Sequence, residues 1–184
     1  MGNKNRIYPV EHAGILDSYW RKLLQNPHKF LRKYIKDGMN VLDIGCGPGF
    51  FTIPLAQLVG KKGHVVAADF QEKMLEIVEK KIQGTEIENR VRLHKCNEES
   101  TNLQDKFDFI LAFYVVHETP DTEKFIEEMA NLLKPEGKFL IVEPSFEVKI
   151  QDFLKIITIA ERANLRVINQ PRMFFSRAVL LELK

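Results

Sequence analysis

Apolar runs of strand length alternate with amphipathic stretches of helical period along most of this chain. The runs predict seven strands, at residues 41–45, 63–69, 91–96, 106–116, 138–143, 165–170 and 174–183. The amphipathic stretches predict five helices, at residues 27–36, 51–59, 71–83, 122–134 and 148–162. Residues 1–18 lack clear periodicity and predict a leading loop or short helix, and residues 19–24 predict a further turn or two of helix.

Residues that favour turns mark several helix ends. Asn26 and Pro27 predict the N-cap and the first residue of the first helix, because Asn caps well and Pro has no N–H to satisfy. We expect this helix to run to Asp37 and Gly38, where glycine would adopt the left-handed cap. Pro135 lies in the sequence KPEG, which predicts a turn between the fourth helix and the fifth strand.

The order of these elements predicts the fold. Strands that alternate with helices favour a doubly wound α/β sheet with helices on both faces. The last two strands are joined only by Pro171, Arg172 and Met173, which is too short for a crossover, so these strands must be antiparallel. We therefore expect one domain of 184 residues, with five parallel strands and a C-terminal antiparallel hairpin.

The composition is that of an ordinary globular protein, with 45% hydrophobic and 28% charged residues. No apolar run approaches the roughly 18 residues that span a bilayer, so we expect no membrane partner. The start, MGNKNRIYPVEHAG, lacks the apolar segment of a secretory signal. Cys46 and Cys96 have no CxxC or zinc-like spacing, so we expect reduced thiols in a cytoplasmic protein.

The charge distribution adds little about partners. The net charge is +2, and residues 1–36 carry eight Lys or Arg side chains against two acids. A solvated helix face explains this excess better than an anion-binding surface does. Because no aromatic-basic repeat accompanies it, we expect no nucleic-acid partner. A homo-oligomer is compatible with the sequence.

A glycine-rich segment, VLDIGCGPGFFT at residues 41–52, joins the first strand to the second helix. Alternating glycines bring backbone N–H groups and a helix N-terminus close to a ligand, with no Cβ in the way. The third glycine comes one residue early for the dinucleotide pattern GxGxxG, and Phe50 takes the sixth position. Asp69 lies 20 residues beyond Gly49, where nucleotide-binding α/β units place a carboxylate for ribose hydroxyls.

Four segments in this order and spacing resemble the class I S-adenosylmethionine (SAM)-dependent methyltransferases. They read VLDIGCGPGFFT, VVAADFQEKML, FDFILAFYVVHETPD and LLKPEGKFLIVEP. The sequence is most similar to their small-molecule group of the ubiquinone/menaquinone-biosynthesis type, from about residue 36 to residue 184. The resemblance implies a Rossmann-like fold and the cofactor SAM, with S-adenosylhomocysteine as its product. It also implies in-line methyl transfer to an unidentified, small-molecule acceptor.

The resemblance implies residues for the methionine and ribose parts of SAM. Asp43 would meet the positively charged amino group of the methionine part. Gly45, Gly47 and Gly49 would let the backbone approach the cofactor. Asp69 would accept hydrogen bonds from both ribose hydroxyls, because a carboxylate offers two oxygens.

The resemblance is weaker for the adenine part. Phe70 and Met74 would flank the ring, although Met74 fits the core face of its helix equally well. Where the family usually has a glycine and an acid, this chain has Cys96 and Asn97, and the side-chain carbonyl of Asn97 can still accept the adenine amino hydrogen bond. Three further positions complete the implied cofactor set: Cys46, Glu98 and Phe113.

Candidates for the acceptor side follow the fourth and fifth strands, because ligands of α/β sheets bind at the carboxyl ends of strands. They are Tyr114, His117, Glu118 and Glu143. His117 has an ordinary pKa near neutrality and is the candidate catalytic base, with a hydrogen bond inside its own loop as the alternative. A metal site of His117, Glu118, Asp121 and Glu143 lacks a recognisable ligand spacing, so we expect no metal.

Two other functions fit parts of this pattern. A SAM-binding subunit without turnover, acting as a partner or regulator, would keep the glycine segment and Asp69. A nicotinamide-dependent oxidoreductase would need the other glycine spacing and would lack the terminal hairpin. An active methyltransferase accounts for all of these features.

The substrate side lacks an obvious lid, because a helix takes up most of the stretch between the fifth and sixth strands. We expect residues 1–36 to form a helical cover on this side, with Tyr19 and Trp20 over the pocket; the alternatives are a cover from a second subunit and a pocket left open. Deleting residues 1–24 should then abolish turnover and leave SAM affinity within a few-fold. An acceptor assay that shows unchanged turnover would reject this cover.

Overall fold

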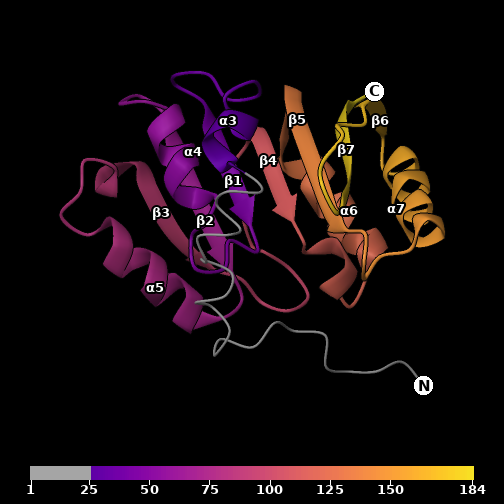
Figure 1. Ribbon diagram of the computed structural model, residues 1–184, viewed down its shortest axis with the longest axis horizontal. Helices are drawn as coiled ribbons and strands as arrows, with labels where there is room; N and C mark the ends of the chain where they lie inside the picture. The colour runs from indigo at the N-terminus through magenta and orange to yellow at the C-terminus, as the bar shows by residue number, and fades with distance from the viewer. Residues whose placement is uncertain (1–25) are drawn as a thin grey trace.

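The computed structural model describes residues 26–184. These residues form a seven-stranded sheet whose bounds are β1 (Asn40–Ile44), β2 (His64–Asp69), β3 (Val91–Lys95), β4 (Phe107–Phe113), β5 (Leu133–Pro144), β6 (Leu165–Asn169) and β7 (Ser176–Leu183). The strands lie in the order β3-β2-β1-β4-β5-β7-β6, as Figure 1 shows from left to right.

The pairing of the strands confirms the predicted topology. The first five strands are mutually parallel, whereas β7 is antiparallel to both of its neighbours, β5 and β6. The short link before β7 therefore returns the chain between β5 and β6. The central strands are covered on both faces, which explains why β4 has six buried residues out of seven and reads as one apolar run.

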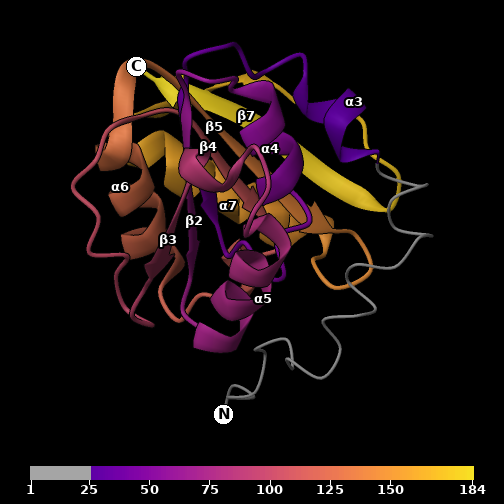
Figure 2. The same cartoon turned by 90° about the vertical axis from the view of Figure 1, so that its left-hand side faces the viewer.

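Helices cover both faces of the sheet. One face carries α3 (Pro27–Leu31), α4 (Thr52–Leu58) and α5 (Glu72–Ile82), and the other carries α6 (Thr122–Leu132) and α7 (Ile150–Arg162). Figure 2 shows α6 on one side of the sheet and α3, α4 and α5 on the other. Two 3₁₀ turns, η2 (Glu88–Arg90) and η3 (Val116–Glu118), lie before β3 and after β4.

Strand alternation divides the core into two apolar clusters. On β5, Phe139 and Ile141 belong to the cluster under α6 and α7, whereas Leu140 and Val142 belong to the cluster under α3, α4 and α5. Glu143 has the same parity as Phe139 and Ile141. Its carboxylate is therefore fully buried on the α6 and α7 side, near the end of β5 and directly after the apolar run of that strand.

The predicted start of the first helix is confirmed, but its predicted length is wrong. The side chain of Asn26 accepts a hydrogen bond from the backbone N–H of Lys29 at 3.0 Å, as an N-cap does. The helix ends at Leu31 rather than at Gly38. A turn follows, in which the N–H groups of Tyr34 and Ile35 both bond the carbonyl of Leu31. The N–H of Gly38 bonds the carbonyl of Val59. Gly38 therefore turns the chain toward β1.

The boundaries of the fourth and fifth strands also differ from the sequence prediction. Leu133 pairs with Phe107, so β5 begins at Leu133 and includes the expected turn around Pro135, with a shift of register between Phe107 and Phe109. At the other end, β4 stops at Phe113 rather than at residue 116. Tyr114 has a φ of 63°, which turns the chain out of the sheet and into η3.

Candidate functional site

Most of the predicted site residues meet at the carboxyl edge of the parallel strands, toward the bottom of Figure 1. The glycines of the glycine segment follow β1, Asp69 ends β2, and residues 114–118 follow β4. Glu143 lies near the end of β5. The fold therefore places the expected cofactor side and acceptor side next to each other, since β1 lies between β2 and β4 and β4 lies beside β5.

The carboxylate of Asp69 joins two backbone segments. Its Oδ2 accepts the N–H of Gly47 at 2.9 Å, and its Oδ1 accepts the N–H of Gln71 at 2.8 Å. Burial raises the pKa of Asp69, and these backbone hydrogen bonds act against the rise. Each oxygen accepts one N–H and keeps a second lone pair for another donor, such as a hydroxyl of a ligand.

Two of the glycines are required for different reasons. Gly45 has a φ of 65°, and a Cβ there would lie 2.3 Å from Cγ2 of Val115, so the chain itself leaves no room for a side chain. Gly47 has a φ of 51°, and a Cβ there would meet no atom within 4 Å. Gly45 thus allows the turn to pack, whereas Gly47 exposes backbone beside open space that can take a ligand.

Asp43 is a second buried acid, near the end of β1 and within the glycine segment. Its Oδ2 accepts the hydroxyl of Thr52 at 2.6 Å. Burial raises the pKa of Asp43 to about 7, the Thr52 hydrogen bond opposes this, and the nearby charge of Asp69 adds to it. Neither acid forms an ion pair with another residue in the range 26–184, so the pair is suited to a positively charged ligand.

Three of the implied cofactor residues have buried side chains: Cys46, Met74 and Phe113. The ring of Phe113 packs against Phe51, with centroids 4.3 Å apart, and against Tyr114 at 4.4 Å. Burial also raises the pKa of the Cys46 thiol well above its ordinary value. Contact of Cys46 or Phe113 with a ligand would therefore use mainly backbone atoms.

The remaining adenine-side candidates lie closer to solvent. Phe70 is half-buried directly after Asp69, and Asn97 and Glu98 are exposed in the connection from β3 to β4. Sequence reasoning missed what holds this connection. Glu128 on α6 accepts hydrogen bonds from the backbone N–H and the hydroxyl of Thr101, at 2.8 and 2.6 Å.

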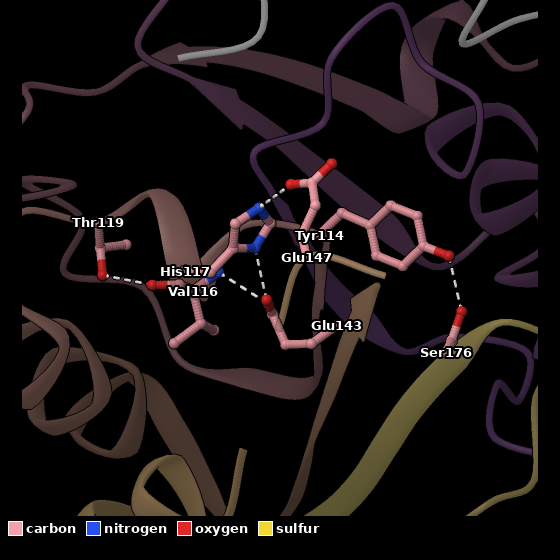
Figure 3. A network of polar contacts seen from close by, with 7 residues as sticks. All are labelled: Tyr114, Val116, His117, Thr119, Glu143, Glu147 and Ser176. Atoms are coloured by element: carbon pink, nitrogen blue, oxygen red, sulfur yellow. Dashed lines mark hydrogen bonds and ion pairs between the residues drawn. The ribbon is translucent and has the colours of Figure 1, made fainter. Parts of the chain in front are cut away.

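A buried carboxylate and a histidine organise the acceptor side (Figure 3). Oε1 of Glu143 accepts the N–H of Val116 at 3.0 Å, and its Oε2 lies 2.5 Å from Nδ1 of His117. The other ring nitrogen of His117, Nε2, lies 3.1 Å from Oε2 of Glu147. His117 therefore bridges one fully buried carboxylate and one whose side chain is 55% exposed.

The charges around His117 determine its protonation. Burial lowers its pKa, but the hydrogen bond and charge of Glu143, with the charges of Glu118 and Glu147, outweigh burial and raise it. Burial also raises the pKa of Glu118 to about 7, against the effect of His117. The two carboxylates that His117 bridges, Glu143 and Glu147, thus favour its imidazolium form over the neutral ring.

Tyr114 adds a strained backbone to the same edge. A φ of 63° is unusual for a residue with a large side chain, and such strain is held in place by surrounding contacts. Its N–H bonds the carbonyl of Val142 at 2.8 Å, and its hydroxyl lies 2.6 Å from the hydroxyl of Ser176 (Figure 3). Ser176 and Glu147 were both missed from the sequence.

The described residues do not assemble the metal site that was considered from the sequence. No group of three or more His, Cys, Asp or Glu side chains in residues 26–184 is arranged to hold a metal ion. Asp121 instead caps α6, where its side chain accepts the N–H of Lys124 at 3.0 Å.

Tyr19 and Trp20, expected in the substrate cover, lie outside the described residues. Within those residues, no helix is both long and apolar enough to cross a membrane.

Comparisons with known proteins agree with this geometry. A family model described as a methyltransferase domain matches residues 35–170. A demethylmenaquinone methyltransferase from Lactobacillus johnsonii is 35% identical over 128 residues, which cover 68% of this chain and 50% of that protein. Another from Halalkalibacterium halodurans is 33% identical over 126 residues, which cover 68% of this chain and 49% of that protein.

A solved structure extends the similarity to nearly the whole chain. The crystal structure of a SAM dependent methyltransferase from Aquifex aeolicus is 28% identical, with a TM-score of 0.86. The match covers 97% of this chain and 100% of that one. The chain spans about half the length of the curated relatives it matches.

The two carboxylates beside His117 lead to a prediction about its titration. We expect the pKa of His117, measured by NMR of its ring protons, to lie above the ordinary value of about 6.5. Glu147→Gln should lower it, because the substitution removes one of the charges that favour the imidazolium ion. Glu79→Gln, an exposed change on α5, serves as the matched control and should leave the pKa of His117 unchanged. A pKa that does not respond to Glu147→Gln would contradict the bridge.

Proposed function

Because this chain belongs to the class I SAM-dependent methyltransferases, in the menaquinone- and ubiquinone-type group, we propose that it transfers a methyl group from SAM to a small-molecule acceptor. The observation that carries the proposal is the pair of buried acids, Asp43 and Asp69, without ion pairs in residues 26–184, beside the open space at Gly47. A ligand that combines a positive charge with hydroxyl donors fits this set. SAM has both.

Each part of SAM has a candidate partner. Asp43 would face the amino group of the methionine part, and the free lone pairs of Asp69 would accept the ribose hydroxyls. The backbone of Gly45, Gly47 and Gly49 would border the methionine part. The candidates for the adenine part are Phe70, Met74, Asn97 and Glu98, and Cys46 and Phe113 would contribute backbone. When bound, SAM supplies a methyl group already activated by the positive charge on sulfur.

The chain's own contribution is mainly to position the acceptor and exclude water. Tyr114 and His117 lie on the acceptor side of the glycine segment and carry the polar groups for this task. His117 would act as a base only in its neutral form, with Nε2 deprotonated and released from Glu147, whose side chain is 55% exposed and so free to move away. Glu143 would then stabilise the imidazolium ion that forms when Nε2 takes a proton from the acceptor.

The acceptor is proposed from the relatives. The two relatives are named demethylmenaquinone methyltransferases, so demethylmenaquinone, in its oxidised and reduced forms, is the first acceptor to test.

The modest positive charge and the absence of an aromatic-basic repeat favour a small molecule over nucleic acid. The two cysteines without paired spacing favour a cytoplasmic location. A homo-oligomer is compatible with the proposal.

Calorimetry and an acceptor assay together test the proposed function. We expect SAM and S-adenosylhomocysteine to bind and NAD not to bind, and we expect methylated product with a quinol or thiol acceptor. Binding of SAM without turnover on any acceptor would favour the non-catalytic subunit. Binding of NAD alone would reject the methyltransferase.

The pKa of Asp43 leads to a prediction about SAM affinity. With a pKa of about 7, Asp43 is largely protonated below neutral pH, whereas a cationic amino group favours the ionised carboxylate. SAM affinity should therefore rise as the pH increases through about 7, and binding below this pH should release a proton. Calorimetry in buffers of different ionisation enthalpy measures both quantities.

The matched variant for this prediction is Asp43→Asn, which keeps an oxygen for Thr52 but cannot ionise. It should bind SAM more weakly and lose much of the rise in affinity near pH 7. A wild-type affinity that falls as the pH rises through 7 would contradict the role of Asp43.

A further inference from the structure

Large apolar side chains are exposed at the same edge of the sheet as the candidate site. Phe174 is 75% exposed, Phe146 is 72% exposed, Phe175 is 67% exposed and Ile150 is 53% exposed. Phe146 lies in the connection from β5 to α7, Ile150 begins α7, and the other two lie just before β7. We call these four residues, three of which are phenylalanines, the aromatic rim. Exposed aromatic residues gathered in this way mark an interaction surface.

The two connections that form the aromatic rim are physically joined. The N–H of Ser145 bonds the carbonyl of Phe175 at 2.9 Å, and the rings of Phe174 and Phe175 have centroids 6.2 Å apart. The rim is therefore one surface contributed by two distant parts of the sequence. It also adjoins the acceptor side, because Glu147 follows Phe146 directly and Ser176, the partner of Tyr114, follows Phe175 directly.

Cations accompany the rim. Lys149 and Arg172 are exposed next to it in the two connections, and Arg177 follows at the start of β7. Nε of Arg177 is buried and has no hydrogen-bond partner among the described residues. Two acids accompany these cations: Glu147, which is engaged with His117, and Asp152 in the first turn of α7, which pairs with Lys155. The rim therefore combines protruding apolar side chains with an excess of positive charge.

We propose that the aromatic rim docks onto the surface of a bilayer that contains anionic lipids. Phe side chains bury apolar area at the boundary between headgroups and acyl chains, and nearby Lys and Arg side chains attract anionic headgroups. A flat lipid surface can contact side chains that protrude from two connections. A second copy of this chain is a less favourable partner, because it would bring the same positive charges together. From the sequence we expected no membrane partner because no run could span a bilayer, but a surface that lies on a bilayer needs no such run.

Docking would bring the acceptor side to the lipid. This consequence rests on the proposed function, because an acceptor with an isoprenoid tail, as in demethylmenaquinone, would then reach Tyr114 and His117 without leaving the bilayer. The docking itself depends only on the rim and its cations. It is therefore measured without any turnover.

Co-sedimentation of the full chain with vesicles tests the docking. We expect binding to vesicles of phosphatidylglycerol and phosphatidylcholine, weaker binding to phosphatidylcholine alone, and loss of binding at high salt, because salt screens the charges. Phe174→Ala with Phe175→Ala should weaken the partition coefficient about tenfold or more, because both rings lose the apolar area that they would bury in the bilayer. Phe174→Trp with Phe175→Trp should retain binding, because Trp also favours the membrane interface.

Matched charge reversals separate a local effect from a general one. Lys149→Glu with Arg172→Glu should weaken binding to the anionic vesicles. Lys61→Glu with Lys62→Glu makes the same change of charge at the opposite edge of the sheet, before β2, and should weaken binding much less. Equal losses from both pairs would overturn the proposed orientation.

Three further outcomes would overturn the docking. They are no sedimentation of the wild type with anionic vesicles, unchanged sedimentation of the double alanine variant, and a wild-type dimer that this variant converts to monomers without any vesicle binding. Calorimetry of SAM on the same preparations keeps the two proposals distinct. A protein that binds SAM but no vesicles fails only the docking, and one that binds vesicles but no SAM fails only the proposed function.

Discussion

The carboxylate of Asp69 holds the two segments on which the candidate site is built. It accepts one N–H from the glycine segment after β1 and one from the start of α5, and both hydrogen bonds lie within 3 Å. A buried carboxylate needs such donors, because burial without them would drive it to the neutral form. The bond from the N–H of Gly47 fixes the backbone of that residue beside open space.

The strands and the terminal hairpin could be predicted from sequence because their causes are local. Buried parallel strands read as apolar runs, and three residues between the last strands allow only an antiparallel return. The wrong boundaries have causes outside the local sequence. Gly38, which was expected to end the first helix, instead bonds the distant Val59, and β5 begins early because Leu133 pairs with Phe107. Neither partner is visible from the pattern around the element itself.

The same distinction applies to the candidate site. The glycine segment and Asp69 stand out from spacing alone, since one strand–turn–helix unit positions them. The partners on the acceptor side come from far along the chain, because Glu147 lies 30 residues from His117 and Ser176 lies 62 residues from Tyr114. Sequence could flag Glu147 as an acid soon after a strand, but nothing marks Ser176. As a result the cofactor side was predicted in more detail than the acceptor side.

The most direct test of the cofactor side is calorimetric titration of SAM into the Asp69→Asn variant. Glu72→Gln, an exposed change in the first turn of α5, is the matched control, and thermal unfolding establishes that both variants fold. We predict that Asp69→Asn binds SAM about tenfold more weakly or worse, because a hydrogen bond to a charged group contributes about 1.5–3 kcal/mol. An affinity equal to that of the wild type in a folded Asp69→Asn variant would contradict the central role of this carboxylate.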